Sequence, residues 1–283
     1  MPPTSRWSMY SQGSYRQPPQ PKRPAKPLKP KPKKKFKKIF VILFAIVIVT
    51  GLVYLLFMQP HPLIKKIGDN ITGKNAAFDK QKYSISDPNS IWIIVNKQKP
   101  LSPLDDAPSN LTIPDIALRS NISDEEKDMR PEAAQALKEM VHEAGGQGIN
   151  LNLQSGYRSY QFQTDLYNDY VKQQGQAAAD SQSARPGYSE HQTGLAADLG
   201  SVTKPSCNVE ACFADTNESQ WLAANAYKYG FIIRYPADKE AVTGYIYEPW
   251  HVRYVGTDLS SEMHKQGITT LEEFFGLSAA PNY

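Results

Sequence analysis

The sequence predicts an α+β fold for residues 89–283. Segments with the apolar spacing of helices and segments with the alternation of strands follow one another without a regular strand–helix–strand order. No segment of the sequence recurs at a fixed period. We therefore expect one domain with a small mixed or antiparallel sheet and flanking helices.

The domain is expected to open with a strand and a helix. Residues 90–96 are a β-branched run typical of a moderately buried strand, and the four prolines at 99–114 indicate an extended loop. A helix is predicted at 129–144 from its apolar face, with Asp128 as a candidate N-terminal cap. The glycine pair 145–146 should end this helix.

A second strand and helix are expected next. Apolar and polar residues alternate at 149–154, which is the pattern of a half-buried strand. A helix is predicted at 160–174, followed by Gly175 and a polar loop at 176–187. The residues expected to face inward from this helix are Phe162, Leu166, Tyr170 and Val171.

The second half of the domain is expected to alternate strands and helices irregularly. A strand at 196–199 should enter the core, a loop at 204–217 carries both cysteines, and a helix follows at 219–229. Further strands are expected at 231–235 and 245–255, and short helices near 258–265 and 270–275.

Positive charge is concentrated at the N-terminus. Residues 1–38 contain twelve of the 32 Lys and Arg residues, nine of the 22 prolines and no acidic residue. The other residues have 20 basic against 28 acidic side chains, so the overall charge of +4 misrepresents them. This pattern excludes nucleic-acid binding as the function of the domain. Prolines and like charges predict a disordered tail at 1–38.

An apolar segment follows the tail. Residues 39–57 are nineteen positions without a charge, and at about 1.5 Å per residue they can cross roughly 30 Å of hydrocarbon as a helix. A cleaved signal peptide is disfavoured because its apolar region would be shorter and no Ala-x-Ala-like site follows. The lysines at 33–35 and 37–38 place the N-terminus in the cytoplasm. We expect a transmembrane helix at 39–58 and an exported linker at 59–88.

The two cysteines, Cys207 and Cys212, both lie in the part expected to be exported. Four residues separate them in a loop-like stretch, so a small disulfide loop is expected in an oxidising compartment. A metal role is disfavoured because no second cysteine pair completes a four-sulfur site.

Two of the five histidines have unusual local settings. His191 follows a Gly-Tyr-Ser-Glu turn, and His251 follows Pro-Trp inside an otherwise apolar strand. Asp198 is flanked by small apolar residues, so a metal or a salt bridge must neutralise its carboxylate. A catalytic zinc needs about three protein ligands and one open position, and a nearby acid such as Glu248 can act as general base. For either histidine alone, a structural role is the alternative.

These residues form one spaced motif. It reads Ser189-x-His191-x-x-Gly194-x-Ala196-x-Asp198, with Glu248-x-Trp250-His251 further on. Ser-Gly-Tyr-Arg-Ser at 155–159, Gln163 and Ser-Ala-Arg-Pro-Gly at 183–187 accompany it. Over roughly 91–277 the chain resembles the VanY-type D-alanyl-D-alanine carboxypeptidase family, which also contains L,D-carboxypeptidases of peptidoglycan.

The resemblance implies a zinc site and a base. His191, Asp198 and His251 would bind Zn²⁺, and Glu248 would be the catalytic base. No metal-binding or base position departs from the motif.

The resemblance also implies residues that bind substrate. Arg158 should point into the cleft, where its planar guanidinium can hold a carboxylate or a developing oxyanion. Gln163 and Ser189 are further candidates, with bracing of the loop as their alternative role. Arg185 is a candidate for substrate binding, and a solvated loop arginine is its alternative.

The expected function is that of a membrane-anchored zinc carboxypeptidase. It would remove the C-terminal D-alanine from peptidoglycan stem peptides outside a bacterial cell membrane. An L,D-carboxypeptidase acting on tetrapeptide stems is the nearest alternative, and an endopeptidase that cuts cross-links would need an open pocket beyond the scissile bond. A catalytically silent wall-binding domain is disfavoured because Glu248 and all three ligands are present.

Overall fold

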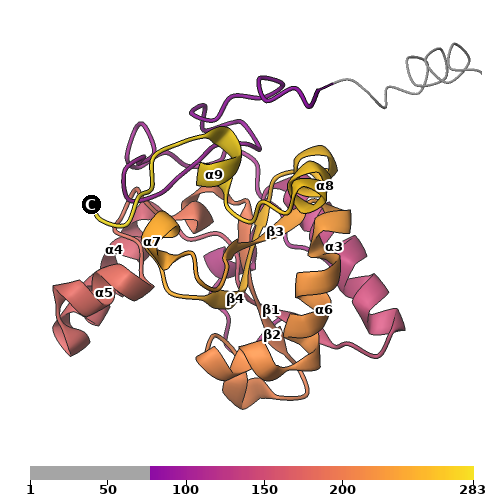
Figure 1. The fold of residues 1–283 in the computed structure, drawn as a ribbon. Coiled ribbons are helices and arrows are strands. Elements are labelled where there is room, and N and C mark those ends of the chain that lie inside the picture. The colour runs from indigo at the N-terminus through magenta and orange to yellow at the C-terminus, as the bar shows by residue number, and fades with distance from the viewer. Residues whose placement is uncertain (1–76) are drawn as a thin grey trace, which may run out of the picture. The chain divides into compact units, whose positions relative to one another are not determined.

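The computed structural model describes residues 77–283, and a four-stranded antiparallel sheet lies at the centre of this domain (Figure 1). The strands are β1 (Leu151–Ser155), β2 (Ala196–Ser201), β3 (Phe231–Tyr235) and β4 (Glu248–Tyr254). They are ordered β1-β2-β4-β3, and each neighbouring pair is antiparallel. The predicted α+β class is confirmed.

The register of the sheet places acidic and imidazole side chains opposite one another. In the central pair, Asp198 of β2 lies opposite His251 of β4. The outer pairs each contain an irregularity, after which Ser155 pairs with Asp198 and Tyr235 pairs with Glu248. Bulges of this kind re-aim side chains and are common beside active sites. The irregularities in the β1–β2 and β3–β4 pairs therefore both lie next to the Asp198–His251 pair.

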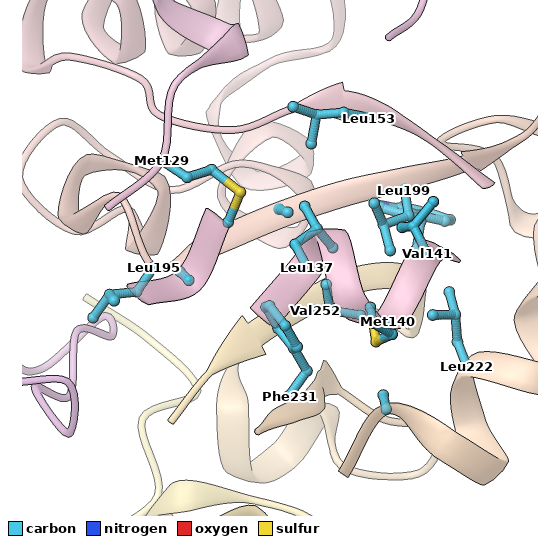
Figure 2. Close-up of a cluster of buried hydrophobic side chains, with 14 of the residues drawn as sticks. Met129, Leu137, Met140, Val141, Leu153, Leu195, Leu199, Leu222, Phe231 and Val252 are labelled. Atoms are coloured by element: carbon cyan, nitrogen blue, oxygen red, sulfur yellow. The ribbon is translucent and has the colours of Figure 1, made fainter. Parts of the chain in front are cut away.

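One face of the sheet is covered by α3 (Pro131–Gly146) and α6 (Asn217–Asn225). Figure 2 shows Leu137, Met140 and Val141 of α3 directed at apolar residues of the strands. The helix predicted at 129–144 is present as Pro131–Gly146, so the glycine pair expected to follow it forms its last two residues. Its expected cap is wrong. Arg130 is the N-cap residue and makes no side-chain cap, whereas Asp128 accepts a hydrogen bond from the Tyr157 amide through its carbonyl.

The helices α4 (Tyr160–Gln174) and α5 (Gln176–Gln182) lie on the other side of the molecule (Figure 1). The bounds of α4 match the prediction. The four residues expected to face inward are only half-buried, and the fully buried positions are Gln163 and Tyr167. Both make polar contacts: Gln163 Nε2 donates to Ala184 O at 2.7 Å, and Tyr167 Oη donates to Asp180 at 2.7 Å. The loop expected at 176–187 is in part helical, in α5.

Residues 92–96 are buried and residues 90–91 are half-buried, but 90–96 do not form the predicted strand. Their backbone runs through turns, with one isolated bridge between Asn96 and Lys99. Two of their carbonyls, those of Ile91 and Ile93, accept hydrogen bonds from the buried guanidinium of Arg253. A side chain thus satisfies backbone groups that a neighbouring strand would otherwise pair.

A second apolar cluster packs beneath this segment. It joins Trp92 to α8 (Thr257–Gln266) and α9 (Leu271–Phe275). Phe78, at the start of the described residues, stacks on Trp92 with 5.6 Å between ring centroids. The shorter elements are the helix α7 (Glu240–Thr243) and 3₁₀ turns at Glu125–Lys127, Glu190–Thr193, Pro205–Cys207, Ala211–Asp215 and Ala226–Tyr229.

In residues 77–283 no helix has the length and apolar character needed to cross a bilayer. The tail expected at 1–38 and the transmembrane helix expected at 39–58 lie outside the described residues. The same is true of most of the linker expected at 59–88.

Candidate metal centre and substrate cavity

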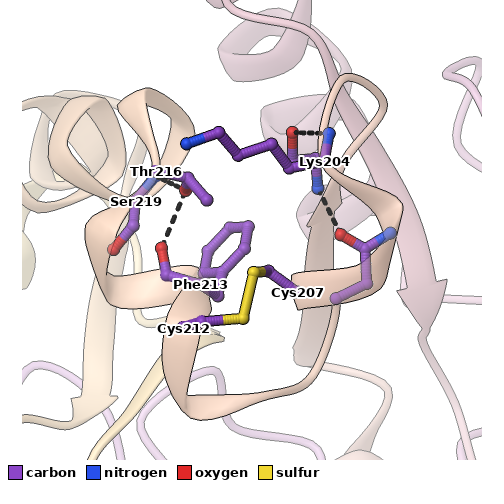
Figure 3. The surroundings of a disulfide bond; sticks show 8 residues. Lys204, Cys207, Cys212, Phe213, Thr216 and Ser219 are labelled. Atoms are coloured by element: carbon purple, nitrogen blue, oxygen red, sulfur yellow. Dashed lines mark hydrogen bonds between the residues drawn. A yellow bond between two sulfur atoms is a disulfide. The ribbon is translucent and has the colours of Figure 1, made fainter.

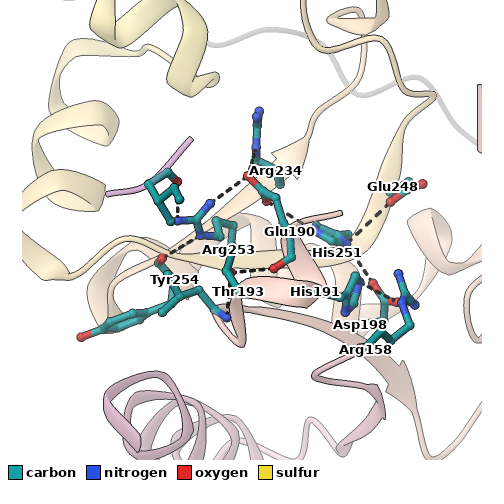
Figure 4. A network of polar contacts seen from close by, with 12 residues as sticks. Arg158, Glu190, His191, Thr193, Asp198, Arg234, Glu248, His251, Arg253 and Tyr254 are labelled. Atoms are coloured by element: carbon teal, nitrogen blue, oxygen red, sulfur yellow. Dashed lines mark hydrogen bonds and ion pairs between the residues drawn. The ribbon is translucent and has the colours of Figure 1, made fainter. Parts of the chain in front are cut away.

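Three buried side chains converge from different elements on one point (Figure 4). His191 comes from the 3₁₀ turn Glu190–Thr193, Asp198 from β2 and His251 from β4. One donor atom from each of the three lies within 4.8 Å of the other two. The structure therefore brings together all three residues expected to bind zinc.

His191 is oriented by a backbone carbonyl. Its Nδ1 lies 2.6 Å from Gly156 O, and because a carbonyl only accepts, Nδ1 must carry the proton. Its Nε2 is then a lone-pair donor, which lies 3.3 Å from Asp198 Oδ2 and makes no hydrogen bond with the described residues. Gly194 ends the turn with φ of 68°, a conformation that disfavours a side chain. A buried nitrogen of this kind fits a metal ligand.

His251 presents its other ring nitrogen to the site. Its Nδ1 lies 3.0 Å from Asp198 Oδ1, while Nε2 points to the opposite side. Asp198 thus bridges the two imidazoles, and it is 5% exposed. Two imidazoles and one carboxylate match the ligands that Zn²⁺ takes in catalytic sites.

The charges of the cluster favour a cation. Burial opposes the ionisation of Asp198, but His191 and His251 outweigh this and hold the pKa of its carboxyl well below the ordinary value. Burial lowers the pKa of His251, but its hydrogen bond with Asp198 and the nearby carboxylate of Glu190 reverse this and raise it to about 9. Without a metal, the cluster thus gains positive charge by binding a proton. A divalent cation can supply that charge instead.

Glu248 lies beside the cluster at the start of β4. Its Oε2 is 3.8 Å from His251 Nδ1, and the residue lines the same cavity. Burial raises the pKa of its carboxyl to about 8, although the neighbouring His251 opposes this shift. A carboxyl close to a cation site and open to a cavity has the position required of a general base.

Arg158 is held at the edge of the same cluster. Its Nη1 lies 3.5 Å from Asp198 Oδ2 and donates to Ser155 Oγ at 3.1 Å, while its Nε donates to Gln163 Oε1 at 3.1 Å. Its backbone amide also donates to His191 O at 3.3 Å. The guanidinium lines the cavity, as expected from the sequence.

The cavity has a volume of about 270 Å³. Its lining combines the metal cluster with Ser189 and with aromatic side chains from α4, β3, β4 and the segment before β4. The aromatic residues are Tyr170, Tyr235, Tyr245, Tyr247 and Trp250. Such a cavity suits a short peptide end with a few charged groups.

Comparison with known proteins agrees with this geometry. A family model described as VanY, D-alanyl-D-alanine carboxypeptidase, matches residues 126–257. The chain is 43% identical over 192 residues to YodJ of Bacillus subtilis (strain 168), a protein named as a carboxypeptidase, and the match covers 68% of this chain and 69% of YodJ. The chain belongs to the VanY family.

Two solved peptidase structures are similar to this VanY-family chain. The LdcB LD-carboxypeptidase is 42% identical with a TM-score of 0.63, over 68% of this chain and 88% of LdcB. A mutant of the D,D-pentapeptidase VanY from the VanB-type vancomycin-resistance cassette, in complex with Zn(II), is 32% identical with a TM-score of 0.54, over 66% of this chain and 98% of that protein. The chain is thus a zinc metallo-carboxypeptidase by family.

Two residues expected to contact substrate lie away from the cavity. Gln163 is fully buried and links Arg158 to Ala184 O, which is a bracing position. Arg185 pairs with both carboxylate oxygens of Asp180 at 3.0 and 2.9 Å and stacks on the Tyr283 ring at 4.1 Å. The structure thus places Arg185 outside the cavity lining, in a contact that holds a loop.

Glu190 was missed by the sequence reasoning. It lines the cavity beside His191 and is 1% exposed, so it is a buried acid next to a proposed ligand. A signal was present in the sequence, because Arg234 and Arg253 are charges inside otherwise apolar strands. Such residues predict a buried acidic partner.

The predicted disulfide between Cys207 and Cys212 is confirmed (Figure 3). It closes a loop whose residues Val209, Glu210 and Ala211 form one wall of the substrate cavity. Val209 has φ of 58°, which is unfavourable for a β-branched residue. The cross-link therefore holds a cavity wall in a conformation that the loop alone disfavours.

Replacing both cysteines, as Cys207→Ser with Cys212→Ser, should raise KM roughly tenfold with a smaller change in kcat. Ordering about one residue costs roughly 1–2 kcal/mol, which the substrate would then have to supply. Steady-state kinetics and zinc analysis of the variant check this, with zinc content expected to match wild type. A loss of zinc, or a fall in kcat at unchanged KM, would contradict it.

Proposed function

We propose that this chain is a membrane-anchored zinc carboxypeptidase that removes the C-terminal D-alanine from peptidoglycan stem peptides. His191, Asp198 and His251 are the proposed zinc ligands, and Glu248 is the proposed base. The observation that carries the proposal is the convergence of these four residues on one cavity that Arg158 also lines. The family membership supports the reaction class.

The side chains divide the work of hydrolysis. When bound, zinc would supply a Lewis acid for the scissile carbonyl and would lower the pKa of water towards about 7. Glu248 takes a proton from the attacking water and passes it to the nitrogen of the departing D-alanine as the peptide bond breaks. Arg158 holds the carboxylate at the end of the peptide through paired hydrogen bonds.

A second candidate is an L,D-carboxypeptidase that takes D-alanine from tetrapeptide stems. The likeness to LdcB, named as an LD-carboxypeptidase, favours it. The two candidates share the metal ligands and the base, and they differ in how the residue before the scissile bond fits the cavity wall.

The proposed anchor is the uncharged segment at 39–57, which follows the basic tail. The lysines before it keep the tail in the cytoplasm and place the domain outside. Because residues from 77 on belong to the domain, the proposed linker is shortened to 59–76, which as a flexible coil would span about 20–25 Å. That arrangement suits a wall-bound substrate.

The assignments of a metal ligand and of a base predict different effects of substitution on zinc content and activity. His191→Ala should lose zinc and activity together, whereas Glu248→Gln should retain zinc and lose about a hundred- to ten-thousandfold in kcat. Zinc analysis and product mass spectrometry on the full-length chain, with penta- and tetrapeptide stems, check this.

The stems also separate the two candidates. Loss of one alanine from the pentapeptide alone supports D,D specificity, and loss from the tetrapeptide alone supports L,D specificity. The proposal is falsified if the wild-type chain binds no zinc and shortens neither stem.

Arg158→Lys should lower kcat/KM about ten- to hundredfold without loss of zinc, because one ammonium cannot reproduce a paired contact with a carboxylate. Arg185→Lys is the matched control, since the structure places that arginine on Asp180 outside the cavity. Kinetics of both variants with the preferred stem decide the point. Equal losses in the two variants would remove the special role of Arg158.

The anchor predicts that the full-length chain stays with the membrane fraction after carbonate extraction. Deletion of residues 39–57 should move the protein to the soluble fraction, because the apolar segment supplies the attachment. Immunoblots of the fractions measure this. Recovery of the intact chain in the carbonate supernatant would sink the proposed anchor.

A further inference from the structure

A buried ion-pair network lies behind the metal ligands. Glu190 directly precedes His191, but its carboxylate points away from the cluster's open side and toward two arginines (Figure 4). Its Oε1 accepts hydrogen bonds from Arg234 Nε and Arg253 Nη1, both at 2.8 Å. Both arginines are 0% exposed. One carboxylate oxygen is therefore fixed by two guanidinium groups.

The other oxygen of Glu190 faces a proposed zinc ligand. Glu190 Oε2 lies 3.6 Å from His251 Nε2, and each of the two atoms is buried without a hydrogen-bond partner among the described residues. His251 presents Nδ1 to Asp198, so a metal bound at Nδ1 leaves the ring proton on Nε2. Glu190 Oε2 is the acceptor that Nε2 faces. A shift of a few tenths of an ångström brings the two atoms within hydrogen-bond range.

The network continues to the C-terminal helix α9. Arg234 donates to both oxygens of Glu272, at 3.0 and 2.7 Å, and Glu272 also accepts from Asn96 Nδ2 at 2.9 Å. Glu272 is 0% exposed. Two buried arginines thus face two buried glutamates, and removing one member leaves a charge without its partner.

The outer end of this ion-pair network lies outside the residues that the family model matches. The family model matches residues 126–257, whereas Glu272 and Asn96 fall outside that range. The carboxylate of Glu272 therefore connects α9 to His251 through Arg234 and Glu190, although α9 contributes no residue to the cavity lining.

We propose that Glu190 is a positioning residue that holds His251 for metal binding, and that Glu272 on α9 fixes Glu190 through Arg234. Partners of this kind set the tautomer and orientation of a metal-bound imidazole. The inference rests on the proposed assignment of His251 as a ligand. It makes α9 a determinant of zinc affinity.

The test is zinc affinity of the full-length chain, measured by competition with a chelator. Glu190→Gln should weaken zinc binding about ten- to a hundredfold. Glu272→Gln should weaken it in the same direction by a smaller factor, because it acts through Arg234. Glu273→Gln is the matched control: this neighbour on α9 is exposed and pairs with Lys239, so zinc affinity should stay at the wild-type value.

Two further measurements distinguish a positioning role of Glu190 and Glu272 from a role in folding alone. The melting temperature of the metal-free variants reports folding, and the visible spectrum of the cobalt(II)-loaded variants reports ligand geometry. We expect an altered cobalt spectrum in folded Glu272→Gln and an unaltered one in Glu273→Gln. If Glu190→Gln does not fold, the Glu272→Gln result decides the proposal.

Two outcomes would overturn the proposal. One is folded Glu190→Gln with wild-type zinc affinity, and the other is Glu272→Gln that matches Glu273→Gln in zinc affinity and cobalt spectrum. An error in the ligand assignment itself would give a different result: His251→Ala would bind zinc as tightly as wild type. That result would refute the ligand assignment on which the positioning role depends.

Discussion

The buried carboxylate of Asp198 is the constraint around which the structure is arranged. An ionised acid inside a protein is strongly unfavourable unless it is paired. Here β2 carries it into the core, and its two oxygens face His191 and His251 at 3.3 and 3.0 Å. The antiparallel register sets His251 directly opposite, and the turn before β2 returns His191 to the same point. The sheet thus fixes the metal-binding geometry through its register.

The charges around the site form two separate groups. On the cavity side, Arg158 and Glu248 flank the ligands where a peptide can reach them. On the core side, Glu190 and Glu272 are enclosed with Arg234 and Arg253, and the two negative and two positive charges balance one another. This separation matters because an unbalanced charge behind the ligands would compete with the metal for His251. The enclosed group also links the ligands to segments outside the matched family region.

The sequence predicted the elements better than their contacts. The bounds of α4 were correct, yet its most buried residues are Gln163 and Tyr167, which make buried hydrogen bonds, and not the apolar residues that were expected to face inward. The segment 90–96 is buried as expected, but its carbonyls are paired by Arg253 rather than by a strand. Both errors have one cause. The spacing of apolar residues predicts which side chains are buried by apolar packing, but it does not predict hydrogen bonds with segments that are distant in sequence.

The sequence by itself determined the class of the fold, the spacing of the zinc motif, the cysteine pair and the candidate base. These are local patterns, since each depends on residue type and separation along the chain. Tertiary structure alone decided that Arg185 lies on Asp180, that the disulfide loop forms a cavity wall, and that Glu190 faces His251. Each of these depends on segments far apart in sequence meeting at a few ångströms, and only the packed chain fixes such distances.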